Sequence, residues 1–240
     1  MSTNLIPGSQ PAADLDRPLY VPIKRRSFFM YAGATAGATA LVLAGCSKND
    51  STPGMVNVGS GDAGVLNYAY ALEQLEAGFY TMVRSGSYYT GLAAGSAEKL
   101  ILDDLYYHEV IHRDFLKAAI TAAGATPIQA LTPNFSSINF GDRASVLGTA
   151  KAFEDLGVAA YNGAGQYITN PGYLLIAGKI VSVEARHAAI IRDLTAENSF
   201  VGSDIITSNS LEMSKPPSTV VATANMYLAD GSKLDVSSIM

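Results

Sequence analysis

Glu109-Val110-Ile111-His112 and Glu184-Ala185-Arg186-His187 are two copies of one pattern, Glu-x-x-His, in two different parts of the chain. Residues three apart share one face of an α-helix. Each copy therefore presents a carboxylate and an imidazole together, which predicts that the two copies bind something in common.

A second pattern precedes each copy. Glu73 is followed seven residues later by Tyr80, and Glu154 is followed seven residues later by Tyr161. The chain thus carries one helical half-site twice, with four carboxylates and two imidazoles directed to one core. Such a ligand set suits two iron or manganese ions better than it suits packing.

Four amphipathic segments have the apolar periodicity of helices, and they span residues 62–84, 96–123, 142–167 and 170–198. Their expected start and stop signals are Asp62 and Ser96 as N-caps, Gly124 as a stop, and Asn170 as an N-cap before Pro171. The first and last pairs are joined by short linkers, whereas residues 125–141 are long enough to cross a bundle. The sequence therefore predicts an all-α four-helix bundle with one long crossover over residues 62–198.

Residues 199–240 are less regular, and we expect an irregular C-terminal extension. Pro216-Pro217 is a plausible start for a short helix that continues through Ala224 to Leu228, with the remainder as surface coil along the bundle.

The first 46 residues have the features of an export signal. Arg25-Arg26 followed by Ser-Phe-Phe resembles a twin-arginine signal, and an apolar run then leads into Leu43-Ala44-Gly45-Cys46, which resembles a bacterial lipobox. Cys46 is the only cysteine of the chain, so we expect it to be lipidated. A plain signal anchor and a general secretory signal are the alternatives.

This signal implies an exported protein in the periplasm or cell envelope. Its expected partners are the twin-arginine translocase and the lipid membrane, and residues 47–61 are expected to form a flexible tether. The net charge is -5 and no basic stripe with aromatic residues is present, so we expect no nucleic-acid partner. A homodimer is one option for the oligomeric state.

Four stretches together resemble the ferritin-like superfamily, and in particular its exported, desiccation-related group: Leu72–Tyr80, His108–His112, Phe153–Tyr161 and Val183–His187. The resemblance implies a ferritin-like bundle with two iron or manganese ions. It implies that Glu73 and Glu154 are ligands from the first and third helices, that Glu109 and Glu184 bridge the ions, and that His112 and His187 each bind one ion.

The superfamily also implies three activities: ferrous-iron oxidation, peroxide reduction or disproportionation, and substrate oxidation by activated oxygen. No substrate pocket is evident in the sequence, which favours the first two, in a role in stress protection. Tyr80 and Tyr161 are expected near the metals as hydrogen-bond partners or radical traps, with plain packing as the alternative. A lipoprotein that holds metal without turnover, or has a structural role, is the non-enzymatic alternative.

His108-Glu109-Val110-Ile111-His112 also fits the zinc-protease pattern His-Glu-x-x-His. That interpretation leaves the second half-site unexplained, so the dimetal interpretation is preferred. The dimetal interpretation makes His108 a surface residue or a residue that contacts a ligand without binding metal itself. Glu76, one turn after Glu73, is left open as a spare ligand, a proton relay or a residue at the rim of the site.

We predict that the mature protein begins at an acylated Cys46. Mass spectrometry of membrane-extracted protein should find this acylated residue, and Cys46→Ala should leave an uncleaved precursor because the lipobox requires the thiol. A soluble mature form that begins at another residue would contradict this prediction.

Overall fold

The computed structural model describes residues 52–239. The predictions for Arg25, Arg26 and Cys46 fall outside this range. Within it, no helix combines the length and the apolar character that a membrane span requires.

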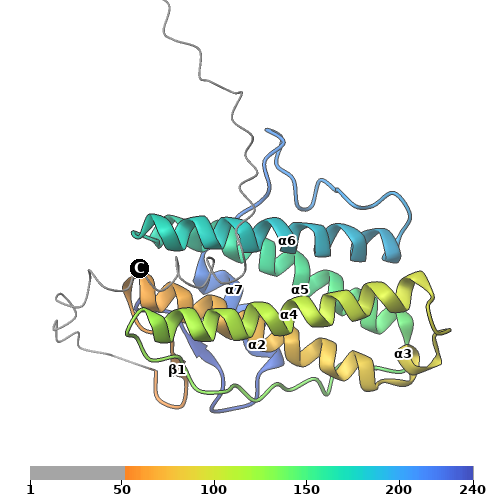
Figure 1. Ribbon diagram of the computed structural model, residues 1–240, viewed down its shortest axis with the longest axis horizontal. Coiled ribbons are helices and arrows are strands. Elements are labelled where there is room, and N and C mark those ends of the chain that lie inside the picture. The colour runs from red at the N-terminus through yellow and green to blue at the C-terminus, as the bar shows by residue number, and fades with distance from the viewer. Residues whose placement is uncertain (1–51, 240) are drawn as a thin grey trace, which may run out of the picture.

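Four long helices form the body of the protein: α2 (Gly61–Ser85), α4 (Ala97–Ala122), α5 (Arg143–Ala164) and α6 (Pro171–Thr195). They lie lengthwise beside one another (Figure 1). The main contacts join α2 to α4 and α5 to α6, as expected of two hairpins, while α4 and α6 touch only slightly. A short helix, α3 (Ser87–Gly91), follows α2.

The long connection between α4 and α5 runs beside α2 from one end to the other. Near the start of α2, the Asn67 amide nitrogen donates to the Thr126 carbonyl and its oxygen accepts from the Ile128 N–H. Beyond the end of α2, the Tyr88 N–H donates to the Phe140 carbonyl. The predicted crossover, and with it the all-α four-helix bundle, is confirmed.

The helix boundaries follow local capping chemistry. The side chains of Ser96 and Asn170 accept hydrogen bonds at the starts of α4 and α6, as predicted. Asp62 was wrongly predicted as the N-cap of the first helix, because Ser60 occupies that position. The Asp62 carboxylate instead accepts the backbone N–H groups of Thr169 and Asn170 at 2.7 and 2.9 Å, and so fixes the α5–α6 turn to α2.

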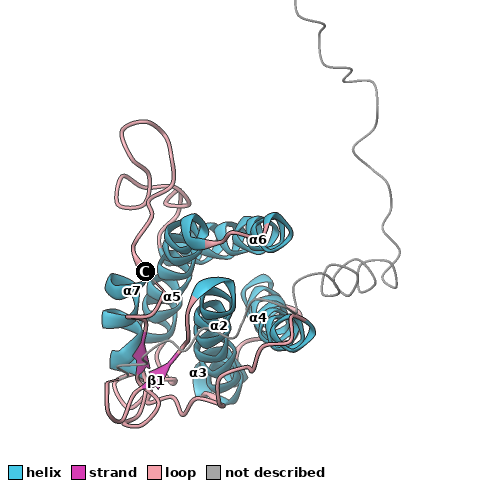
Figure 2. Cartoon of the chain, turned by 90° about the vertical axis from the view of Figure 1, so that its left-hand side faces the viewer, coloured by secondary structure: helices cyan, strands magenta, loops and turns pink. Residues whose placement is uncertain are grey.

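The two chain segments that flank the bundle differ from the expectation. The predicted short helix is present as α7 (Pro217–Ala224), followed by a 3₁₀ turn (Asn225–Tyr227). Beyond it, β2 (Leu234–Asp235) pairs in parallel with β1 (Val56–Asn57), which lies in the expected tether (Figure 2). The residues after Pro216 are therefore not surface coil, and they add these buried side chains to the main core: Val220, Val221, Ala224, Leu228, Leu234, Val236 and Ile239.

The segment before α7 lies directly against α5. The Lys215 N–H donates to the Ala159 carbonyl at 2.9 Å. A Cβ atom added at Gly163 would lie 1.8 Å from the Lys215 carbonyl oxygen. Only glycine at position 163 allows this close approach between backbone and helix.

We predict that Gly163→Ala lowers the free energy of unfolding by about 1–3 kcal/mol, because the segment at Lys215 has to move away. Gly148→Ala is the matched control in the same helix, since its added Cβ meets open space. The control should raise stability by roughly 0.4–1 kcal/mol. Urea denaturation measures both changes, and equal effects would refute the close approach.

Candidate metal centre

The six predicted ligands come from all four long helices. Glu73 lies on α2, Glu109 and His112 on α4, Glu154 on α5, and Glu184 and His187 on α6. The four carboxylates are completely buried, and His187 is 3% exposed. Burial of four carboxylates in an apolar core is very unfavourable unless cations or hydrogen-bond donors compensate.

The structure brings these side chains together as two overlapping groups that are each able to hold a metal ion. The first contains Glu73, Glu109, His112 and Glu184, and the second contains Glu109, Glu154, Glu184 and His187. Within each group, the ligand atoms lie within 4.8 Å of one another. Glu109 and Glu184 belong to both groups, which is the position expected of bridging carboxylates.

Each imidazole presents Nδ1 to the carboxylates. The Nδ1 atom of His112 lies 2.7 Å from Glu184 Oε1 and 3.5 Å from Glu73 Oε2. In the other half, His187 Nδ1 lies 2.8 Å from Glu109 Oε1 and 3.5 Å from Glu154 Oε2. The two half-sites therefore have the same arrangement.

Several of these buried atoms approach closely without the geometry of a hydrogen bond. The buried ligand atoms that lack a hydrogen-bond partner are Glu73 Oε2, Glu154 Oε2, both oxygens of Glu109 and of Glu184, and Nδ1 of His112 and His187. An unsatisfied buried polar group costs roughly 1–3 kcal/mol. Atoms that converge on a shared space rather than pairing fit metal coordination, and the set of carboxylate and imidazole donors fits iron or manganese.

Without metal, the site has to balance its charge with protons. Burial raises the pKa of Glu109, and the adjacent Glu184 and Glu73 raise it further. Burial disfavours the imidazolium form of His112, but the surrounding carboxylates outweigh it and raise the pKa to about 12. Because metal ligands must be deprotonated, metal binding to this site would release protons.

The two tyrosines connect the two halves. The Tyr80 hydroxyl on α2 donates to Glu154 Oε1 on α5 at 2.5 Å, and the Tyr161 hydroxyl on α5 donates to Glu73 Oε1 on α2 at 2.5 Å. Burial is the main reason why both phenol pKa values are raised, so both hydroxyls remain donors. This geometry agrees with the expected role of the tyrosines as hydrogen-bond partners. Each tyrosine bonds to the glutamate of the opposite helix and not to the glutamate seven residues before it in the sequence.

His108 contacts His187 rather than sharing a ligand space with His112. Its Nδ1 lies 2.8 Å from His187 Nε2, and the two rings stack with centroids 5.1 Å apart. A hydrogen bond on the outer nitrogen fixes the orientation of a metal-binding imidazole. His108 is therefore a positioning residue for His187, and it belongs to neither candidate metal group.

Glu76 is buried beside the site but also belongs to neither group. Its pKa is raised first by burial and then by Glu109 and the other glutamates, which favours the neutral acid. Gly157 makes room for it, because a Cβ there would lie 3.0 Å from Glu76 Oε1. Glu76 lies three residues after Glu73, and Gly157 lies three residues after Glu154. These two equivalent positions therefore carry different residues, and the repeat between the halves is not exact here.

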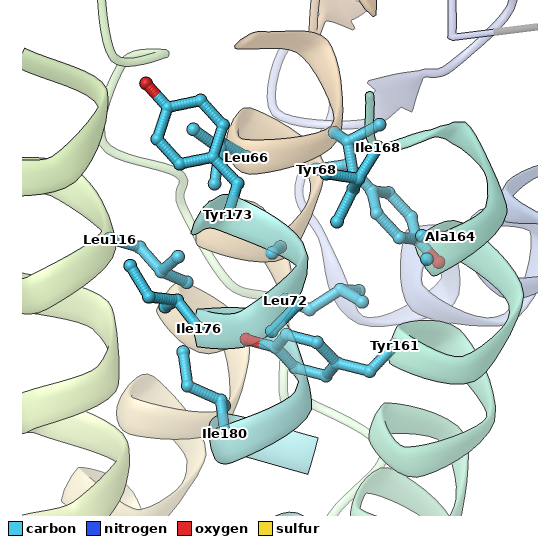
Figure 3. A pocket seen from close by; sticks show the side chains of 14 residues that line it. Leu66, Tyr68, Leu72, Leu116, Tyr161, Ala164, Ile168, Tyr173, Ile176 and Ile180 are labelled. Carbon is cyan, nitrogen blue, oxygen red and sulfur yellow. The ribbon is translucent and has the colours of Figure 1, made fainter. Parts of the chain in front are cut away.

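Two apolar hollows lie at the end of the site near the start of α6. One is an internal cavity of about 20 Å³, into which the Tyr161 ring and Ile180 project (Figure 3). The other is a surface groove of about 520 Å³ that reaches His112. Sequence patterns gave no sign of either hollow, because their lining residues are spaced like ordinary core residues.

Comparison with known families agrees with this geometry. Residues 61–197, over half of the chain, match the family described as "Ferritin-like domain". The chain belongs to the ferritin-like family. A comparison with curated proteins found no match.

We predict that His187→Ala loses one of the bound metal ions while His108→Ala keeps the full stoichiometry. His108→Ala should weaken metal binding about 10- to 100-fold, because it removes only the support of a ligand. Elemental analysis at saturating metal, with Lys117→Ala as a surface control on α4, measures these changes. Loss of all metal in His108→Ala with full retention in His187→Ala would instead support the zinc-protease interpretation.

Proposed function

We propose that this protein binds two iron or manganese ions between Glu73, Glu109, His112, Glu154, Glu184 and His187, and uses them in redox chemistry. The reactions that we favour are oxidation of ferrous iron and reduction or disproportionation of peroxide. The observation that supports this proposal most strongly is the convergence of unsatisfied carboxylate oxygens and imidazole nitrogens in the bundle core. When bound, two such ions would give electrons to dioxygen or peroxide, and they would recover them from ferrous iron or from a second peroxide molecule that is oxidised to dioxygen.

The surrounding residues suit this role. Tyr80 and Tyr161 hold the outer carboxylates in place, and His108 holds His187. The apolar core excludes bulk water, which strengthens the electrostatic interactions of the ligands. Glu76 is a buried acid that belongs to neither metal group and whose neutral form is favoured by burial, so it is a candidate for moving a proton.

We also propose that the protein acts outside the cytoplasm, anchored to the membrane through an acylated Cys46, as one of the desiccation-related members of the family. The signal-like residues around Arg25-Arg26 and the lipobox-like Leu43–Cys46 support this proposal. Export of a folded protein by the twin-arginine route suits a site that is loaded before export. The resemblance to the desiccation-related group supports a role in stress protection as part of this proposal.

A protein that holds metal without turnover is the second candidate, because a complete ligand set supports metal binding but not catalysis. The zinc-protease alternative is disfavoured by the contact of His108 with His187, since the two histidines of the motif share no ligand group.

We predict two iron or manganese ions per chain in protein purified from its own host, and consumption of peroxide or of dioxygen with ferrous iron by this holoprotein. Glu109→Ala should lose both the second ion and the activity, because Glu109 serves both ion positions. Elemental analysis and an oxygen electrode test the two parts separately. Two ions without turnover would support the metal-holding candidate, and absence of both ions would refute the proposal.

A further inference from the structure

Among residues 52–239, the most exposed of the six proposed metal ligands is His112, which lies in the groove between α4 and α6. His112 is 13% exposed through its side chain, against 4% or less for the other five ligands. The groove walls are apolar, with Ile111, Phe115 and Ala118 on α4 and Ile176, Ile180 and Val183 on α6. Its volume of about 520 Å³ is within the range of sites for small organic molecules, roughly 300–1,000 Å³.

The two half-sites differ in what lies against the outer nitrogen of each imidazole. The residue before the Glu-x-x-His pattern is His108 on α4 but Val183 on α6. His108 covers the outer nitrogen of His187. Val183 cannot make an equivalent hydrogen bond to His112, and it lines the groove instead.

The charges in the groove favour an anion. Asp114 lines the groove, but Arg113 Nη2 lies 2.8 Å from its Oδ1. Lys179 also lines it, and among residues 52–239 it has no ion-pair partner. The apolar walls and this cation make the groove a poor route for ferrous ions, which need polar or anionic ligands.

A second copy of the chain is a less suitable occupant of the groove than a small anion. A protein surface laid over the groove would bury the Lys179 ammonium and would have to place a carboxylate against it, because an unpaired buried charge is costly. A small anion can pair with Lys179 while its apolar part fills the groove. The wall formed by Ile176 and Ile180 also lines the internal cavity of Figure 3, so the groove ends at the core of the bundle.

We infer that the groove between α4 and α6 is a binding site for a small amphipathic organic anion, with an apolar body against the walls and an anionic group near Lys179. It lies beside the metal position of His112. The inference goes beyond the proposed function, because neither of the two favoured reactions involves an organic molecule. Binding depends on the apolar walls and on Lys179, and of the six proposed metal ligands only His112 lines the groove.

The test measures binding of labelled decanoate to the metal-loaded full-length protein by equilibrium dialysis below the micelle concentration. We expect saturable binding of one decanoate per chain, with weaker binding of decanol and of decyltrimethylammonium. Lys179→Gln should weaken decanoate binding by about twofold to fivefold, the size expected of a partly exposed ion pair. Lys117→Gln, an exposed lysine on α4 outside the groove, is the matched control and should bind normally.

Ala118→Trp should reduce decanoate affinity by at least tenfold because it fills the groove, whereas Ala122→Trp on the same helix should not. Manganese-loaded protein should broaden the NMR signals of bound decanoate, and zinc-loaded protein should not. Equal affinity in Lys179→Gln and Lys117→Gln, or in Ala118→Trp and Ala122→Trp, would overturn the inference. A dimer that Ala118→Trp dissociates, without decanoate binding, would also overturn it in favour of a subunit interface.

Metal content is measured on the same samples, so a failure of the dimetal proposal can be distinguished from a failure of the groove proposal. Decanoate binding to a protein that takes up no metal would keep the groove site and refute the dimetal function. Two bound ions without decanoate binding would keep the dimetal function and refute the groove site. Preferential capture of anionic lipid vesicles, with no binding of free decanoate, would overturn the inference in favour of a membrane contact.

Discussion

The mutual repulsion of four buried carboxylates is the constraint on which the rest of the structure depends. Glu73, Glu109, Glu154 and Glu184 face one another in a core that offers them two imidazoles and two phenols. Burial acts to raise the pKa of Glu184, but the two imidazoles together outweigh it and hold this pKa at about 2. Two divalent cations would balance the same four charges directly, and metal binding would then stabilise the fold.

The two halves of the site have the same arrangement of Glu, His and Tyr side chains, but they differ in the residues that surround the two histidines. Reciprocal bonds from Tyr80 to Glu154 and from Tyr161 to Glu73 tie α2 to α5. Where the halves differ, the two imidazoles have different surroundings. His108 closes the His187 side, and Val183 leaves the His112 side open to a groove.

The bundle, its crossover and the clustering of the six Glu and His side chains could be predicted because they are encoded by local periodicity and by a motif present twice. Helix geometry alone places Glu109 with His112, and it does so again for Glu184 with His187. The pairing of β1 with β2, the true role of Asp62 and the hollow beside His112 could not be predicted in this way. Each depends on contacts between residues far apart in the chain, such as Asp62 with Thr169, which leave no pattern in a single sequence.

The most direct test of this account is anomalous diffraction from crystals of protein purified with its native metal. The account predicts two anomalous peaks in the bundle core, roughly 3.5–4 Å apart as in other two-metal sites. One peak should lie next to His112 and the other next to His187, with the carboxylates of Glu109 and Glu184 between the two peaks. A single peak bound by His108 and His112, or a core with no peak and with protonated carboxylates paired to one another, would contradict it.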